Sequence, residues 1–386
     1  MQSEEATIQS HWLTRKGISP LQFGLSFLIL VGIPLTLWSR YADKNMPTEV
    51  EGVLYVTYLQ NVSWSLSLLV IFPLFLGLSL HFYNTYPGVL QYLYNTTAAA
   101  PDKAIFHNLC KKIDRSVNHK IITFAALLVT IIFTAYIYIN YLSICDVISW
   151  MTNGLYLTDL STCGDCLIKG FTNRGVVAFI IQVMLSSWIL IFAIRSLLFI
   201  RGLFELFNSK ETNVRLDPFH PDGVSGLAKL SQLATLQAMM LFLLGIYVSL
   251  KVIDRIYFQQ ISIFDGIGNT VAIVSYVVIA PAVFFLILGS AYHKMLEAKE
   301  SVISILCDKV KDVLIQIKME SDYGENKKKL EYLKSLEEQK SSLQKSILVW
   351  PFNVKSIQGF FSAVLTPLIA PLITGAVELY NFINKL

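Results

Sequence analysis

The chain has 386 residues, of which 54% are hydrophobic and only 15% are charged, and its mean hydropathy is +0.54. This balance lies outside that of ordinary soluble domains, so the composition excludes a soluble globular protein and predicts one that crosses a membrane several times. The net charge of +4 requires no nucleic-acid partner, because it mostly reflects an uneven distribution of Lys and Arg between loops. No binding of duplex nucleic acid is expected.

Before the first apolar run, residues 1–20 are polar and carry Glu4 and Glu5, and no small-residue cleavage site follows that run. A cleavable signal peptide is therefore not expected, and the first apolar helix is predicted to remain in the membrane.

Six apolar stretches are long enough to cross a membrane as helices. About 20 residues of α-helix span the hydrocarbon core. Charge-poor runs of this length lie at residues 21–38, 64–83, 121–143, 176–200, 231–250 and 268–290. Runs such as IITFAALLVTIIF are apolar on every face and lack the alternation of a membrane β-barrel. The sequence therefore predicts an all-α polytopic transmembrane protein with a six-span domain over residues 21–290.

The distribution of Lys and Arg predicts the orientation of these spans. Basic residues are concentrated in the N-terminal segment, in loops 84–120 and 201–230, and after residue 291, whereas the other three loops hold two each. Basic loops remain on the cytoplasmic side of a membrane. We therefore expect a cytoplasmic N-terminus and a cytoplasmic polar region after the sixth span.

The cysteines agree with this orientation. Cys145, Cys163 and Cys166 fall in the predicted outer loop, whereas Cys110 and Cys307 fall on the cytoplasmic side. The outer loop contains no His, so a disulfide among its three cysteines, or a pair of surface thiols, is favoured over a zinc site. Neither a metal nor a cofactor is expected.

Amphipathic helices are predicted beyond the membrane boundary. After Pro101, apolar residues recur every four positions at Ile105, Leu109, Ile113 and Val117, which predicts an amphipathic helix running into the third span. Spans two and three are therefore expected to project into the cytoplasm.

Residues 291–349 are predicted to form a cytoplasmic antiparallel helical hairpin. Its first half carries apolar residues at coiled-coil spacing: Ile303, Leu306, Val310, Val313 and Ile317. SDYGEN then supplies turn residues, and a second apolar series follows: Leu333, Leu336, Leu343 and Ile347. The hairpin is either a packing element or a stalk for assembly or gating.

The last segment, residues 350–386, is apolar and has no charge between Ser356 and Val377. Its length permits a seventh crossing, but Pro367 and Pro371 each remove a helical hydrogen bond. A kinked span, a re-entrant segment and an interfacial helix anchored by Trp350 and Phe352 all remain open, with insertion favoured.

The predicted spans lack the residues of an enzyme or a proton-coupled pump. No Asp or Glu lies inside the six spans, and Arg195 is close enough to the cytoplasmic end to extend its head outward. The Walker, zinc-protease and GxSxG hydrolase motifs are absent from the sequence. We therefore predict no enzymatic activity.

Uncharged polar residues inside the spans are candidates to line a pore. Gln182 and Ser186 share one helical face, and Gln237 and Ser275 lie in the fifth and sixth predicted spans. Hydrogen bonding between helices is the simpler explanation for such residues.

The stretch DPFHPDGVSGL, residues 217–227, precedes the fifth span. Asp222 is a suitable N-cap residue, and the prolines hold Asp217 and His220 outside the helix. Gly223 and Gly226 leave backbone amides uncrowded, as at an anion-binding helix start. A plain helix start is favoured, and a gating contact or a ligand site remains possible for Asp217, His220, Asp222, Gly223 and Gly226.

HPDGVSGL before a span, the helical hairpin and WPF before an apolar tail together resemble a broad group of bacterial multispanning proteins with the motif HPDGxGGL. Ser225 stands where that group has the first glycine of a pair. Some proteins of this look are membrane effectors of anti-phage systems such as Hailong, in which a partner or nucleotide signal controls an oligomeric pore. The resemblance covers about the last 175 residues.

The resemblance implies a homo-oligomeric gated ion channel or pore in a bacterial inner membrane. The expected partners are lipid, further copies of the chain, and a cytoplasmic protein or a nucleotide-type ligand. A transporter for a small or lipid-like solute is the first alternative. A non-conducting membrane sensor or scaffold is the second.

Overall fold

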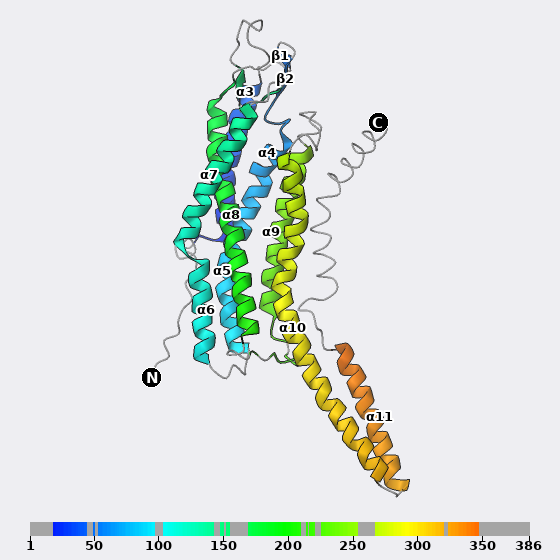
Figure 1. Cartoon of the computed structure of the whole chain (residues 1–386). Helices are drawn as coiled ribbons and strands as arrows, with labels where there is room; N and C mark the ends of the chain where they lie inside the picture. The colour runs from blue at the N-terminus through cyan, green and yellow to red at the C-terminus, as the bar shows by residue number, and fades with distance from the viewer. Residues whose placement is uncertain are drawn as a thin grey trace, which may run out of the picture.

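A computed structural model of the chain describes residues 18–44, 49–50, 53–96, 103–142, 147–149, 152–154, 169–209, 214, 216–220, 225–253, 267–319 and 323–346. The described residues form an elongated bundle of long helices that run side by side (Figure 1). The predicted all-α class is confirmed, with small strands at one end of the bundle as the exception.

The helices, in chain order, are α2 (Pro20–Phe27), η1 (Leu28–Gly32), α3 (Ile33–Asp43), α4 (Val62–Leu66), η2 (Ser67–Ile71), α5 (Phe72–Thr96), α6 (Lys103–Val117), α7 (Lys120–Leu142), α8 (Asn173–Asn208), α9 (Ala228–Ile253), α10 (Ile267–Met319) and α11 (Tyr323–Ser346). The two η segments are π-helical turns inside otherwise α-helical spans.

Five helical segments of the described residues are long and apolar enough to cross a membrane: Pro20–Asp43, Val62–Tyr94, Ala104–Tyr136, Asn173–Asn208 and Ala228–Lys251. They correspond to the first five predicted spans. The sixth, residues 268–290, lies within α10, most of whose side chains in this stretch are outside the described residues. The C-terminal segment, residues 350–386, also lies outside them.

Large apolar side chains cover the outer faces of the bundle. On α7 they include Ile121, Phe124, Ile132 and Phe133, all of which are exposed. An apolar surface of this extent is typical of contact with lipid rather than with water. This surface and the length of the helices agree in identifying a membrane protein.

The first span begins with a capping box. The backbone amide of Gln22 donates to the hydroxyl of Ser19, and the amide of Ser19 donates to the side-chain carbonyl of Gln22. Pro20 occupies the first helical turn, where its missing N–H costs nothing. This helix packs closely on α5, and a Cβ added at Gly24 would lie 2.4 Å from the carbonyl oxygen of Pro73. Glycine is therefore required at this crossing.

The predicted amphipathic helix exists as α6, but it does not run unbroken into the third span. It ends at Val117, and α7 begins at Lys120 after a short turn. Ile113 and Val117 are buried as expected. In the first half of the helix, however, the buried residues are Phe106 and Cys110 instead of the predicted Ile105 and Leu109. A strict four-residue spacing drifts around a helix of 3.6 residues per turn, so the buried face shifts by one position.

The core of the bundle lies between α5, α8 and α9. The ring of Phe82 on α5 meets the rings of Phe192 and Phe199 on α8 edge to face, at centroid distances of 5.3 and 6.1 Å. Such edge-to-face pairs add about 0.5–1.5 kcal/mol to the burial of each ring. α9 packs against α5, and α10 packs against both α8 and α9.

Short strands lie at one end of the bundle, which we call the strand end (Figure 1). β1 (Glu49–Val50) pairs antiparallel with β2 (Val53–Val56), and β2 pairs parallel with β3 (Val147–Ser149). β4 (Thr152–Gly154) and β5 (Lys169–Phe171) form a second, antiparallel pair. Strand pairing therefore connects the loop after the first span with the loop after the third, which the sequence did not predict.

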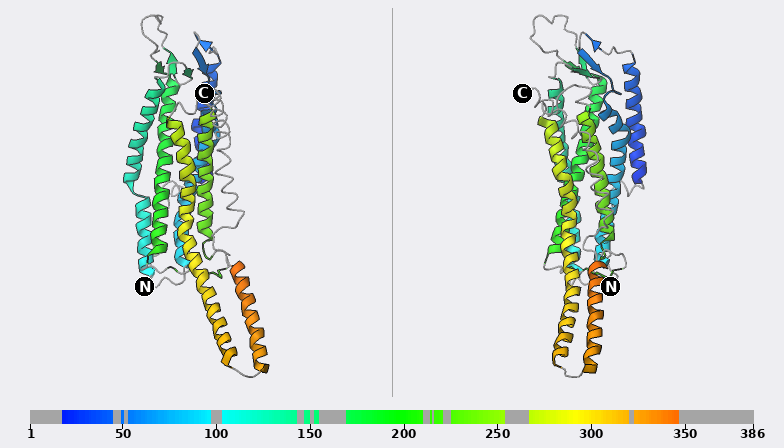
Figure 2. Two further views of the ribbon diagram at one scale, coloured as in Figure 1. Left: turned by 45° about the vertical axis from the view of Figure 1, so that its right-hand side comes forward. Right: turned by 90° about the vertical axis from the view of Figure 1, so that its right-hand side faces the viewer.

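At the opposite end, α10 continues beyond the bundle and α11 returns beside it (Figure 2). We call this the hairpin end. Val313 and Leu336 are buried there, and the other apolar residues of the predicted seam within α10 and α11 are half-buried. Lys299 Nζ donates to the backbone carbonyl of Gln344 at 2.6 Å and links the two helices near the bundle.

Candidate functional site

The stretch before α9 differs from the predicted helix start. α9 begins only at Ala228, several residues after Asp222. The prediction that Asp222 is the N-cap of this helix is therefore wrong. Ser225 and Gly226 have φ values of 57° and 84°, which form a left-handed turn directly before the helix. A turn of this kind ends the preceding loop and separates Asp222 from the first helical turn.

The other members of this motif do not converge on one site within the described residues. Asp217 is exposed, and its Oδ1 accepts from the amide of Phe219 at 2.9 Å, while its carbonyl accepts from the amide of His220 at 3.1 Å. These bonds form a local turn, as is usual for Asp before proline. Asp222 and Gly223 lie outside the described residues.

The candidate pore-lining residues have different surroundings. Gln182 Nε2 donates to Ser186 Oγ at 3.0 Å within α8, so these two residues share a face as expected and satisfy each other. Gln237 is 3% exposed, and among the described residues neither its Nε2 nor its Oε1 has a hydrogen-bond partner. The backbone of Ser275 belongs to α10, but its side chain is outside the described residues.

The candidate disulfide cysteines, Cys145, Cys163 and Cys166, all lie outside the described residues. Of the two described cysteines, Cys110 is buried in the core and Cys307 is partly exposed on α10, and both are free thiols.

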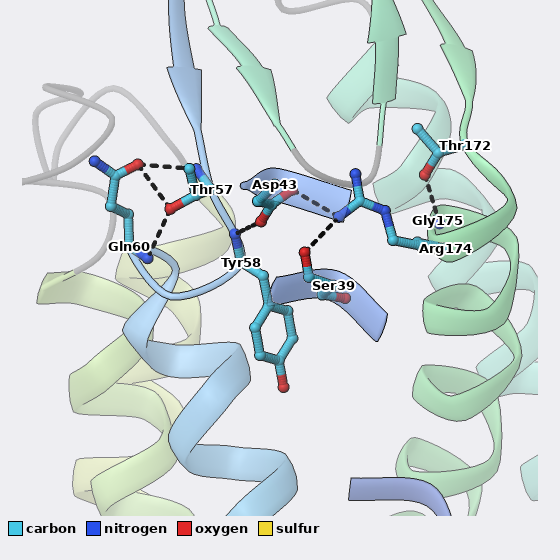
Figure 3. Close-up of polar contacts among 8 residues, drawn as sticks. All are labelled: Ser39, Asp43, Thr57, Tyr58, Gln60, Thr172, Arg174 and Gly175. Carbon is cyan, nitrogen blue, oxygen red and sulfur yellow. Dashed lines mark hydrogen bonds and ion pairs between the residues drawn. The ribbon is translucent and has the colours of Figure 1, made fainter. Parts of the chain in front are cut away.

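A buried ion pair joins two spans at the strand end (Figure 3). Arg174 Nη1 lies 2.6 Å from Asp43 Oδ1, and the two side chains are only 7% and 8% exposed. The same nitrogen donates to the backbone carbonyl of Ser39 at 3.2 Å. Breaking a buried pair by removing one partner costs about 3–5 kcal/mol, because the other charge is left in a low dielectric.

The loop before α4 is fastened to this pair. The amide of Tyr58 donates to Asp43 Oδ2 at 2.7 Å, and the Tyr58 hydroxyl lies 2.9 Å from Thr36 Oγ1. Burial raises the pKa of the Tyr58 phenol above its usual 10.0, an effect that the hydrogen bond with Thr36 partly offsets. The phenol is therefore neutral at physiological pH, and Asp43 connects α3, α8 and the β2–α4 loop.

The sequence places Arg174 among the basic residues of the predicted outer loop before the fourth span and does not predict this pair. The sequence offers one signal for the pair: Asp43 follows the first predicted span and Arg174 precedes the fourth, on the same predicted side of the membrane. Charge position alone does not show whether two residues separated by 131 positions meet.

A second polar cluster lies where α6 meets α7. The Tyr86 hydroxyl donates to Asp114 Oδ1 at 2.8 Å, and Asn118 Nδ2 donates to the Tyr86 oxygen at 2.8 Å and to Asp114 Oδ1 at 2.9 Å. Asp114 Oδ1 thus accepts from two donors, one on α5 and one in the α6–α7 turn. The cluster therefore links the end of α6 and the turn after it to α5.

Arg195, on α8, lies close to this cluster but is not extended into water as the sequence predicted. The residue is 9% exposed, its Nη2 donates to Thr123 Oγ1 at 3.3 Å, and its guanidinium lies 5.4 Å from the centroid of the Tyr83 ring. None of the ion pairs formed within the described ranges includes Arg195. Its positive charge is therefore buried against a ring and a hydroxyl.

Two buried arginines thus stand on one helix. Arg174 and Arg195 are separated by about 31 Å along α8, from a rise of about 1.5 Å per residue. This distance equals the thickness of the hydrocarbon core of a bilayer, about 30 Å. One arginine has a carboxylate partner, and the other has none among the described residues.

Several buried polar atoms without a hydrogen-bond partner among the described residues lie on α8 and α9. In the part of the chain that the structure describes, buried atoms without a hydrogen-bond partner include Arg195 Nε, Ser196 Oγ and both side-chain polar atoms of Gln237. Each buried unsatisfied group costs about 1–3 kcal/mol, so water or a ligand that bonded these atoms would be stabilising.

Contacts between α9 and α5 give the depth of Gln237. Lys229 Nζ lies 5.0 Å from the centroid of the Tyr92 ring, and the ring of Tyr247 lies 5.3 Å from that of Phe72. Gln237 lies between these two contacts on antiparallel helices, which brings it to the level of Tyr83 and therefore of Arg195.

Comparison of the chain with protein-family models, with curated proteins and with solved structures finds no match. Within the described residues there is also no group of three or more His, Cys, Asp and Glu side chains that could hold a metal ion.

Proposed function

We propose that this protein is a homo-oligomeric gated channel or pore of a bacterial inner membrane, with its hairpin end in the cytoplasm. The observation that carries this proposal is the layer of buried, unsatisfied polar atoms on α8 and α9, two helices apolar enough to cross a membrane. Polar groups buried within membrane-spanning helices are costly and often mark pathways for water or ions.

The position of the layer supports this proposal. Arg174 and Arg195 are one hydrocarbon thickness apart on α8, so the layer lies at one membrane boundary when Arg174 lies at the other. Large rings pack at the same depth, including Phe82 and Phe192. Apolar constrictions close channels by excluding water, so these rings are suitable for a closed gate.

The hairpin is the proposed element that receives the signal. α10 runs without a break from the last proposed span into the hairpin, so a displacement of the hairpin reaches the bundle through one continuous helix. A partner protein or a nucleotide-type ligand, as the resemblance to anti-phage effectors implies, would act there.

The test is electrical recording from the purified protein in planar bilayers. A channel gives discrete conductance steps, a transporter gives a flux that saturates with substrate, and a scaffold gives neither. Phe192→Ser places a hydroxyl in the proposed constriction and is expected to increase the open fraction severalfold. Phe133→Ser is the matched control, because that ring is 61% exposed on the lipid face of α7. The absence of steps from both the parent protein and Phe192→Ser would reject the channel.

A further inference from the structure

The charge of Arg195 is the starting point for assigning a ligand to the buried layer. On the same helix, Arg174 is compensated by Asp43 at 2.6 Å, which is how proteins usually bury a guanidinium. Arg195 lies beside the Thr123 hydroxyl, which accepts from one of its nitrogens, and beside the Tyr83 ring, which offers only a weak cation–π attraction.

Asp114, the carboxylate of the neighbouring cluster, forms no direct ion pair with Arg195 among the described residues. Its Oδ1 already accepts from Tyr86 and from Asn118. Within the described ranges no carboxylate pairs with this buried cation, so an anion bound at this position would stabilise it.

Other hydrogen-bond donors lie at the same depth. Gln237 supplies a carboxamide Nε2 and Ser196 a hydroxyl, both residues are 3% exposed, and neither group has a partner within the described residues. A guanidinium, an amide N–H and a hydroxyl can all donate to an anion, whereas a metal cation would meet the unpaired positive charge of Arg195. The chemistry of the layer favours a small anion over a cation.

We propose that Arg195, Ser196 and Gln237 form an anion-binding layer inside the bundle, so that the permeant species is an inorganic anion of the size of chloride. The assignment of a permeant species rests on the channel function proposed above. The binding of an anion does not, and the two are tested separately.

Anion binding is tested on the purified protein in detergent by measuring its melting temperature in potassium chloride and in potassium gluconate at equal ionic strength. A ligand that binds only the folded state raises the melting temperature, so chloride is expected to stabilise the parent protein by a few degrees over gluconate. Arg195→Gln should abolish this difference, and Arg195→Lys, which retains the charge, should keep part of it.

Arg201→Gln is the matched control. Arg201 lies on α8 as well, but its side chain is 77% exposed and pairs with Glu205, so its replacement removes the same charge from a solvated position. The chloride effect should be unchanged in this variant. If Arg195→Gln fails to fold, Gln237→Leu provides the same test, because it removes a donor from the layer without removing a charge. Equal melting temperatures of the parent protein in the two salts would overturn the anion-binding layer.

Selectivity is tested by the reversal potential across a bilayer with a potassium chloride gradient. Chloride should permeate better than potassium in the parent protein, and Arg195→Gln should lower the permeability ratio by roughly tenfold, since a buried charge concentrates counter-ions by at least this factor. A cation-selective current would overturn the permeant anion and leave the channel intact. Chloride stabilisation without any current would retain the layer and reject the channel.

Discussion

At the scale of single residues, the buried Arg174–Asp43 pair shows how a charge is accommodated inside this bundle. The Arg174–Asp43 pair gains from short distance and from low dielectric, but both side chains lost their hydration to form it. Removing one partner should therefore lower the free energy of unfolding strongly, whereas replacing both with apolar residues of similar size should change it much less.

A double-mutant cycle on this pair should show that dependence. Asp43→Asn leaves the Arg174 charge buried and should lower the free energy of unfolding by about 3–5 kcal/mol, whereas Asp43→Leu combined with Arg174→Met should lie much closer to the parent protein. Lys112→Met is the control, because the Lys112–Glu205 pair is largely exposed and should contribute at most about 1 kcal/mol. Equal losses at the two pairs would show that water reaches Asp43.

Ser225 provides a second residue-scale prediction. Its φ of 57° is left-handed, a conformation that costs a residue with a Cβ about 1–2 kcal/mol and costs glycine nothing. Ser225→Gly restores the residue found in the resembling motif and should stabilise the protein by about 1 kcal/mol after the added freedom of the unfolded chain is counted. Chemical denaturation of the two proteins measures this difference, and Ser231→Gly, inside α9, should destabilise by about 1 kcal/mol instead.

At the scale of elements, the pattern of residues predicted the helices better than their ends. Ser19 and Gln22 have the spacing of a capping box and do start the first span. Asp222 has the chemistry of an N-cap and predicts a helix start there, but the left-handed turn of Ser225 and Gly226 delays the start of α9 to Ala228. More than one residue near a helix can act as its N-cap, and the backbone conformation adopted in the folded protein decides where the helix begins.

The tertiary contacts of the candidate site could not be predicted in the same way. That Gln182 and Ser186 share a face follows from helical spacing, and their bond is present. The pairing of Arg174 with Asp43 and the burial of Arg195 depend on how α8 is rotated against α3, α5 and α7. A single sequence contains no signal for that rotation, because α8 carries apolar residues on most of its own faces and no one face is marked as the buried one.

The hairpin gives the prediction at this scale. Val313 is buried between α10 and α11, so Val313→Asp places a charge in an apolar seam and should cost several kcal/mol or disperse an oligomer that the seam supports. Ile315→Asp is the matched control, since Ile315 is 51% exposed on the same helix. Native gels and melting curves of the two variants decide the question. An unchanged Val313→Asp would mean that the seam is solvated and that the hairpin is not a stalk.

At the scale of the whole molecule, the two ends of the bundle have different chemistry. The strand end holds paired short strands and a closed ion pair, whereas the hairpin end holds α6, the turn before α9 and the lysine-rich α11. If the membrane lies between Arg174 and Arg195, the basic end is cytoplasmic by the positive-inside rule. The orientation, the gate and the site of the signal all depend on this assignment.

Thiol labelling of the native cysteines tests the orientation directly. A reagent that cannot cross the membrane should modify Cys163 and Cys166 in intact cells after mild reduction, because both lie in the proposed outer loop. Cys307 is partly exposed on α10 and should react only in inside-out vesicles, whereas Cys110 is buried and should stay silent in both preparations. Cys307→Ser removes the vesicle signal and serves as its control. Labelling of Cys307 in intact cells would reverse the orientation, place Arg195 at the outer boundary, and remove the hairpin from contact with any cytoplasmic signal.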